Sequence, residues 1–171
     1  LAERTEENAE LHVRRAEARV PIEVVSSSQN LRPIAEMGGP LPLHVGASGK
    51  VLLAWLRDAE QAALAAASAA RFPEVPASEA DALHSRLASV RRLGWADSDG
   101  ERSHGVAAVS APIFEVSGEV GGAVVVSGPS SRLCARRRRE IASLVVEAAA
   151  RTSRDAGYQP GSASQRHEEG F

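Results

Sequence analysis

Two apolar runs joined by a short polar segment constrain the fold of this chain more than any other feature. They cover residues 106–114 and 120–127, and the segment between them contains Glu115, Val116, Ser117 and Gly118. Runs this short, rich in valine and bounded by glycine and proline, are typical of buried strands. The short connection ending in glycine predicts an antiparallel hairpin. Its strands carry small residues such as Ser110 and Ser127 where a core prefers bulk, so either the backbones pack tightly or something else fills the space.

The flanking segments predict more strands and several helices. Residues 10–27 alternate apolar and polar side chains in part, which favours a second hairpin with its turn near residues 16–18. Residues 28–43 are rich in proline and glycine and indicate a long irregular loop, a length that is often functional. Helical patterns follow at 51–56, 59–67, 80–90 and 136–152. The order predicts an α+β fold, an antiparallel sheet with helices on its faces.

Composition bounds the function classes. The 171 residues suit one domain, and the net charge of -2 gives the domain as a whole no electrostatic reason to bind nucleic acid or an anionic membrane. Cys134 is the only cysteine, which excludes an internal disulfide and is compatible with the cytoplasm. No apolar run is long enough to cross a bilayer. The polar N-terminus without methionine is not a signal peptide, and it indicates a fragment of a longer protein.

Small residues precede the helical pattern at 51–56, in the order Gly46, Ala47, Ser48, Gly49 and Lys50. The spacing does not match a phosphate-binding loop, because only two residues separate the glycines and valine follows the lysine. A helix N-terminus presents free N–H groups and a positive dipole end, which suit a carboxylate. The alternative is a small-residue helix start without a ligand. For Lys50, a pocket position and a structural salt bridge remain open.

Other polar residues point away from catalysis. The histidines lack metal-binding spacing, so no metal or other cofactor is expected, and His44 is interpreted as a hydrogen-bonded core histidine. The acidic residues at 97–101 indicate a solvated turn, since no nucleophile or partner base accompanies them. The basic run at 136–139 indicates a solvated face, or contact with acidic groups of a partner subunit, rather than DNA contact.

Two segments resemble one known family. They are PLHVGASGKVLLAWL at 42–56 and RRLGWADSDGERSHGVAAVSAPIFEVSGEVGGAVVVSGPSSRL at 91–133. Several spaced motifs in them, including P-L-H, G-K-x-L-L-A, A-P-[IV]-F and S-G-P, are similar in order to those of the effector-binding domain of IclR-type bacterial transcriptional regulators. The resemblance covers residues 1–156, and residues 157–171 are expected to form a disordered tail.

The resemblance implies a GAF-like fold with a curved antiparallel sheet flanked by helices. It also implies that the complete protein carries an N-terminal winged helix-turn-helix domain, absent from this chain, which alone contacts DNA. Members pair into homodimers or homotetramers. Their effectors are usually small organic acids or aromatic metabolites, so the expected partner is a small molecule, most simply a carboxylate, and no membrane is involved.

The expected effector site lies between the loop at 28–43 and the central hairpin. Ala47, Ser48 and Gly49 would hold a carboxylate, and Ser98 lies near a position where the family often has aspartate. Ala108 replaces a cysteine that the family often has two residues before Ser110, which widens the pocket. The complete set of expected effector-binding residues is Met37, Leu41, Ala47, Ser48, Gly49, Ser98, Ala108, Ser110, Val125 and Ser127.

The sequence therefore predicts the ligand-sensing and oligomerisation domain of an IclR-type regulator, not an enzyme. Two alternatives remain, a ligand-free structural oligomerisation module and an enzyme on a GAF-like fold. The lone Cys134 argues against two-thiol redox chemistry in the latter.

Overall fold

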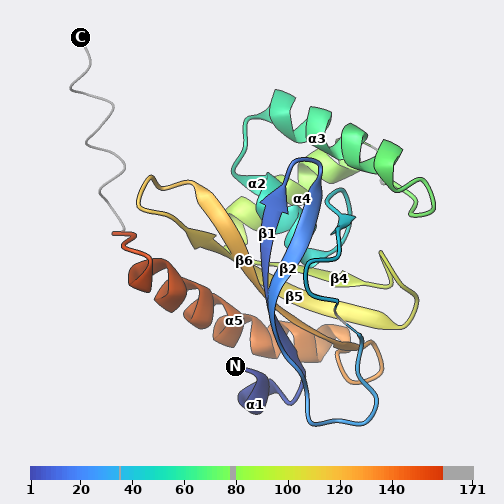
Figure 1. Cartoon of the computed structure of the whole chain (residues 1–171), viewed down its shortest axis with the longest axis vertical. Helices are drawn as coiled ribbons and strands as arrows, with labels where there is room; N and C mark the ends of the chain where they lie inside the picture. The colour runs from blue at the N-terminus through green and yellow to red at the C-terminus, as the bar shows by residue number, and fades with distance from the viewer. Residues whose placement is uncertain (35, 78–79, 160–171) are drawn as a thin grey trace.

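One antiparallel sheet organises the molecule. The computed structural model describes residues 1–34, 36–77 and 80–159. Within them six strands are ordered β3-β2-β1-β6-β5-β4 across the sheet (Figure 1). Their bounds are β1 (Asn8–Arg15), β2 (Ala18–Val25), β3 (Leu41–Pro42), β4 (Ala96–Asp99), β5 (Val106–Phe114) and β6 (Val120–Pro129).

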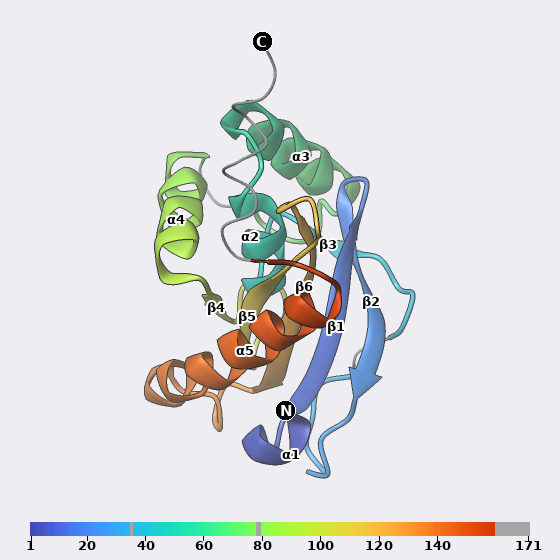
Figure 2. The ribbon, with the colours of Figure 1, turned by 90° about the vertical axis from the view of Figure 1, so that its left-hand side faces the viewer.

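Helices cover both faces of this sheet. Their bounds are α1 (Ala2–Thr5), α2 (Ala47–Ala54), α3 (Asp58–Arg71), α4 (Ala80–Leu93) and α5 (Ala135–Asp155). The long helix α5 crosses one face over β5 and β6, while α2 packs on the other with α4 beside it (Figure 2). The result is the predicted α+β architecture of the GAF-like type.

Alternation along the strands divides the interior into two cores. One side of β5, with Ala107, Val109, Ala111 and Ile113, packs with β6 and α5 around Val145. The opposite core gathers apolar side chains of α2, α4 and the sheet, among them Leu43, Val51, Leu53, Leu87 and Ala123. Because successive residues of a strand point to opposite faces, both runs of the central hairpin must be almost wholly apolar.

The predicted strand pairs are confirmed, with differences at their edges. β5 and β6 form the central hairpin, and β1 and β2 form the second one, with Ala16 at a positive φ of 51° in the turn. At the N-terminus, only the short helix α1 precedes β1, which begins at Asn8. The loop at 28–43 is not wholly irregular, because Leu41 and Pro42 pair with β2 as β3. Most of the expected C-terminal tail, residues 160–171, lies outside the described residues.

The basic run at the start of α5 is partly structural. Arg138 is buried and donates to Asp97 Oδ2 and Asp99 Oδ2, both at 2.8 Å, and to the Leu133 carbonyl at 2.8 Å. Arg136 and Arg137 pair with Glu140 on their own helix. The acidic groups that Arg138 contacts therefore lie on β4 of the same chain, not on a partner subunit. Asp97 and Asp99 belong to a strand and not to the solvated turn that the sequence indicated.

Candidate functional site

Strand register brings small side chains together on the sheet face that carries α2. Ser98 on β4 pairs with Ala108 on β5, which pairs with Ser127 on β6. In the next row Val125 pairs with Glu10 on β1. Directly opposite residues of an antiparallel pair share a face, so these side chains form a continuous floor.

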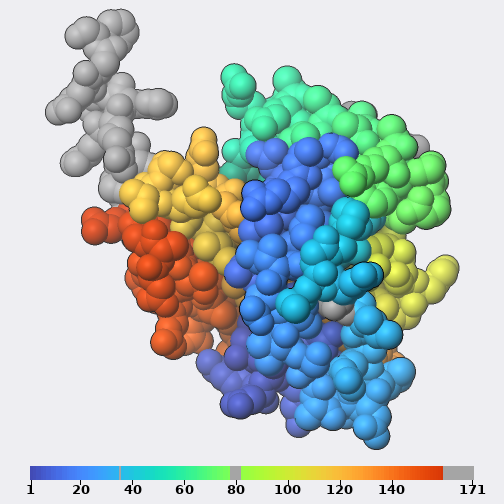
Figure 3. All heavy atoms as spheres, in the orientation of Figure 1, coloured from blue at the N-terminus to red at the C-terminus, as the bar shows by residue number. Residues whose placement is uncertain are grey.

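A cavity of about 230 Å³ lies above this floor. The start of α2 and the connection between β2 and α2 enclose it, and the space-filling view shows that connection running over this side of the molecule (Figure 3). The volume is below the ~300 Å³ at which pockets for drug-sized ligands begin. The lining residues are Glu10, His12, Arg19, Pro33, Ile34, Glu36, Leu41, Gly46, Ala47, Ser48, Ser98, Arg102, Ser103, Val106, Ala108, Val125 and Ser127.

Most residues expected in the effector site line this cavity. They are Leu41, Ala47, Ser48, Ser98, Ala108, Val125 and Ser127. Met37 does not line the cavity, and its side chain is 62% exposed on the loop.

Gly49 and Ser110 are also outside the lining, each for a packing reason. A Cβ on Gly49 would lie 2.3 Å from the Leu43 carbonyl oxygen, so glycine is needed for the close approach of α2 to that segment. The Ser110 hydroxyl is fully buried and donates to the Val124 carbonyl at 2.9 Å. Ser110 is therefore small because the backbones pack tightly there, and not because it leaves space for a ligand.

A hydrogen-bonded array of buried polar side chains forms one wall of the cavity. The Glu10 carboxylate accepts from Ser127 Oγ and lies 2.8 Å from His12 Nε2. His12 Nδ1 lies 3.0 Å from Ser48 Oγ at the start of α2. With the proton on Nε2, His12 donates to Glu10 and accepts from Ser48, which satisfies every member of the chain.

Electrostatics fix the protonation of this array. Burial lowers the pKa of the His12 imidazole, although the hydrogen bond and charge of Glu10 act in the opposite direction. Burial alone would raise the pKa of Glu10, but the hydrogen bond from His12, with Ser127 and Arg19, leaves that pKa lowered. A neutral imidazole beside an ionised carboxylate is the state consistent with both directions.

Arg19 is the buried cation of the cavity. Its Nη1 donates to the Val45 carbonyl at 2.6 Å and to the Pro42 carbonyl, which holds the chain before α2 in place. Burial lowers the pKa of the guanidinium to about 9, and the charge of Arg102 acts in the same direction. The group therefore remains charged at neutral pH.

Lys50 takes the structural role. Its Nζ donates to Glu101 Oε1 at 2.6 Å and to the Asp97 carbonyl at 2.5 Å. The second oxygen of Glu101 accepts from the Gly46 N–H at 2.8 Å. Glu101 therefore caps α2 from outside the cavity, and Lys50 is not among the cavity's lining residues.

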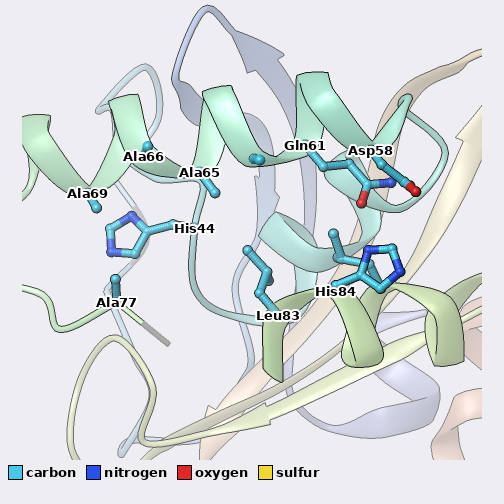
Figure 4. A pocket seen from close by; sticks show the side chains of 11 residues that line it. His44, Asp58, Gln61, Ala65, Ala66, Ala69, Ala77, Leu83 and His84 are labelled. Atoms are coloured by element: carbon cyan, nitrogen blue, oxygen red, sulfur yellow. The ribbon is translucent and has the colours of Figure 1, made fainter. Parts of the chain in front are cut away.

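His44 belongs to a separate groove between α3 and α4 (Figure 4). Its Nδ1 lies 3.0 Å from Ser68 Oγ and its Nε2 lies 3.2 Å from the Val75 carbonyl oxygen. Both ring nitrogens are thus occupied, as expected for a core histidine. The groove is lined mainly by alanines of α3 and by Leu83, Leu87 and His84 of α4.

Among the described residues, no group of at least three histidine, cysteine, aspartate or glutamate side chains is arranged to hold a metal ion. None of the helices described combines the length and the apolar character that crossing a membrane requires.

Sequence reasoning missed the titratable side chains of the lining, namely Glu10, His12, Arg19, Glu36 and Arg102. A signal was present in β1, where Glu10 and His12 alternate with Leu11 and Val13. Alternation identifies two faces but does not say that the polar face is covered by another segment.

The antiparallel sheet flanked by helices, with a polar cavity beside the start of α2, is the GAF-like arrangement of a regulatory domain. The chain belongs to the IclR family: the family described as "Bacterial transcriptional regulator IclR C-terminal" matches residues 1–154. The similar proteins named below are transcriptional regulators, which supports a regulatory domain rather than an enzyme.

Two curated relatives illustrate the match. The chain is 30% identical over 150 residues to the HTH-type transcriptional regulator BhcR of Paracoccus denitrificans, covering 87% of this chain and 54% of that protein. It is 30% identical over 159 residues to the HTH-type transcriptional regulator KdgR of Escherichia coli, covering 92% of this chain and 60% of that protein. The chain thus spans little more than half the length of these relatives.

A solved structure extends the likeness to three dimensions. The C-terminal domain of the E. coli transcriptional regulator KdgR superimposes with a TM-score of 0.74 at 25% sequence identity. The match covers 92% of each chain.

Proposed function

We propose that this chain is the ligand-sensing and oligomerisation domain of an IclR-type transcriptional regulator. A small organic acid or aromatic metabolite binds in the cavity at the start of α2. Binding controls an N-terminal winged helix-turn-helix domain that contacts DNA in the bacterial cytoplasm, within a homodimer or homotetramer.

The observation that carries this proposal is the composition of the cavity. Ala47 and Ser48 bring the N-terminus of α2 to one side, and Ser98, Ala108 and Ser127 leave space on the sheet opposite. A helix N-terminus favours an anion through its free N–H groups and its dipole. A cavity of about 230 Å³ suits a small metabolite.

Control of a DNA-binding domain requires differential binding. A ligand shifts an equilibrium between two subunit arrangements only by the difference in its affinity for them. The β2–α2 connection and the start of α2 enclose the cavity, so a ligand there touches two segments that are distant in sequence from the floor strands. The ligand would therefore stabilise one position of the β2–α2 connection and the α2 start relative to the floor strands.

A thermal-shift screen of organic acids tests this proposal with Ser48→Asp. The Ser48 hydroxyl lies at the α2 start and bonds His12, so a carboxylate there repels an acid. An acid at ~100 times its Kd adds about 2.7 kcal/mol to stability, which for a chain of this size is a Tm rise of about 5–10 °C. We expect that rise in the parent and its loss in Ser48→Asp.

The matched control is Ser85→Asp, at an exposed position on α4. It adds the same charge away from the cavity and should respond to acids like the parent. Equal responses of Ser48→Asp and the parent would exclude the α2 start as the acid site. A screen without any response would favour the ligand-free oligomerisation module.

A further inference from the structure

We propose that the cavity selects a ligand with a single acidic group, which binds Arg19, and a hydrogen-bond donor such as a hydroxyl, which is directed to Glu10. This inference rests on the proposed function and names the class of organic acid that the site accepts. It assigns Arg19 as the charge receptor and Glu10 as the group that rejects a second acid.

The first observation is an unsatisfied nitrogen. Arg19 is 4% exposed and lines the cavity, and its Nε is a buried side-chain nitrogen for which the described residues provide no hydrogen-bond partner. Its bonds go to the backbone carbonyls of Pro42 and Val45, not to a carboxylate. A buried donor without an acceptor costs about 1–3 kcal/mol, so the described residues leave the Arg19 guanidinium incompletely satisfied.

The surroundings of Arg19 add positive potential. Its Nη2 lies 3.0 Å from the place that a Cβ on Gly46 would occupy, and its Nη1 lies 3.2 Å from the corresponding place on Gly49. The guanidinium therefore faces the first turn of α2, whose dipole end is also positive. Arg102 contributes further charge from the cavity lining.

Nearby anions do not satisfy this potential. Glu101 binds Lys50 and the Gly46 N–H, and Glu10 binds His12 and Ser127. Both carboxylates attract the Arg19 charge at a distance. Bidentate or charge-assisted hydrogen bonds from a guanidinium to a carboxylate are among the strongest in proteins, so a ligand acid gains most at Arg19.

The second observation is the ionised Glu10 carboxylate, which explains why the ligand should carry only one acidic group. Glu10 is buried, lines the cavity and is held ionised by its hydrogen bonds with His12 and Ser127. Each carboxylate oxygen retains a lone pair for another donor. A ligand hydroxyl can therefore donate to Glu10, whereas a second ligand carboxylate there would meet a like charge in a medium that screens it poorly.

Two chemically matched series of compounds test the preference for a single acidic group, with the 171-residue chain as the protein. One comprises propanoate, 3-hydroxypropanoate, malonate and propanamide, and the other pentanoate, 5-hydroxypentanoate, glutarate and pentanamide. Isothermal titration calorimetry should rank hydroxy acid above plain acid in the series that fits the cavity. The diacid and the amide should each bind about tenfold or more weaker than the hydroxy acid.

Substitutions of Arg19 and Glu10 test which residue contacts each end of the ligand. Arg19→Gln should abolish the preference for acid over amide, and Arg19→Lys should keep part of it. Glu10→Gln should reduce the discrimination against the diacid by about fivefold or more. The matched control is Arg14→Gln, because Arg14 pairs with Arg19 across β1 and β2 but is not among the cavity's lining residues.

A measurement on the parent protects the test against loss of folding in the Arg19 variants, since Arg19 also holds two carbonyls. Formate is titrated while the arginine Nε–H resonances of the parent are followed by ¹H–¹⁵N NMR, with the Arg19 signal assigned by through-bond correlation to the backbone amide of the same residue. Saturable movement of that signal supports the proposal.

Three results would overturn it. If screened acids bind but the Arg19 Nε–H does not respond, or if diacids bind at least as tightly as hydroxy acids, the ligand class is wrong while the proposed function stands. If no acid binds at all, this inference fails; the proposed function fails with it only if aromatic metabolites do not bind either.

Discussion

Among single residues, His12 links the acid-base state of the cavity to the stability of the fold. It is buried between Glu10 and Ser48, and the charges of Arg19 and Arg102 act on it. Since burial lowers its pKa below the ordinary 6.5, the unfolded chain takes up a proton near that pH before the folded chain does. Stability is therefore lost as pH falls from about 6.5 through the folded pKa.

His12→Gln should make the unfolding free energy less dependent on pH between about pH 7 and about pH 5. One proton contributes at most about 1.4 kcal/mol per pH unit. In the parent, Glu10 does not obscure this window, because its lowered pKa places its own loss of stability below the ordinary 4.5. The amide introduced by His12→Gln can still donate a hydrogen bond to the Glu10 carboxylate. Urea denaturation at several pH values measures the effect, with His84→Gln on the exposed side of α4 as the control. An equally steep decline in His12→Gln and the parent would contradict it.

The residues of the site differ in how far the sequence predicts them. Ser127 was recognisable because it is small where a hairpin core prefers bulk, and Ser98 and Ala108 were expected from the family resemblance. The register places the three side by side. Glu10, His12 and Arg19 were not recognisable, because polar residues that alternate along a hairpin are usually solvent-facing. They are buried because the chain between β2 and α2 returns over them, a contact that no local pattern encodes.

Among the elements, β4 is held in part by a distant helix. It is short, and Arg138 at the start of α5 bonds two of its carboxylates, those of Asp97 and Asp99. Asp99 also accepts from Ser130, which lowers the pKa of its carboxyl together with Arg138. These bonds fix β4 beside β5 and hence place Ser98 at the cavity.

Arg138→Gln should destabilise the fold by about 1–3 kcal/mol, because the buried Leu133 carbonyl and the two carboxylates lose a charged donor. Arg137→Gln is the matched control: its guanidinium is partly exposed and reaches only Glu140 at 3.6 Å, so its effect should stay within about 0.5 kcal/mol. Urea denaturation gives both values. Equal effects of the two substitutions would mean that the β4 contact does not contribute to stability.

The elements themselves follow from local patterns more closely than their contacts do. The hairpins, α2 and the apolar face of α5 were predictable from periodicity and from turn residues. β3 was not, because a strand of two residues carries no period, and it forms through pairing with Ala18 and Arg19. The role of Arg138 could not be predicted from the sequence for a similar reason, because the same basic run occurs whether its side chains face solvent or a carboxylate.

In the whole molecule, one sheet is shared by two cores on its opposite faces. Leu133 belongs to the core under α5, and Leu53 to the core under α2 and α4. The cavity adjoins the second core only. Because β5 and β6 contribute alternate residues to both cores, we expect loss of packing on one face to weaken the other.

Leu133→Ala tests this cooperativity with Trp55 as the probe, which packs against the second core and whose ring also meets Phe114 at the end of β5. Trp95 packs against the first core and Trp55 against the second, so a Trp95→Phe background leaves Trp55 as the only tryptophan. Leu133→Ala should cost about 2–5 kcal/mol, and the urea midpoint from Trp55 fluorescence should fall together with the midpoint from circular dichroism. A Trp55 midpoint that stays at the value of the Trp95→Phe parent would show that the face bearing the cavity unfolds independently of α5. Coincident transitions would instead mean that a ligand bound on one face stabilises the packing of α5 on the other.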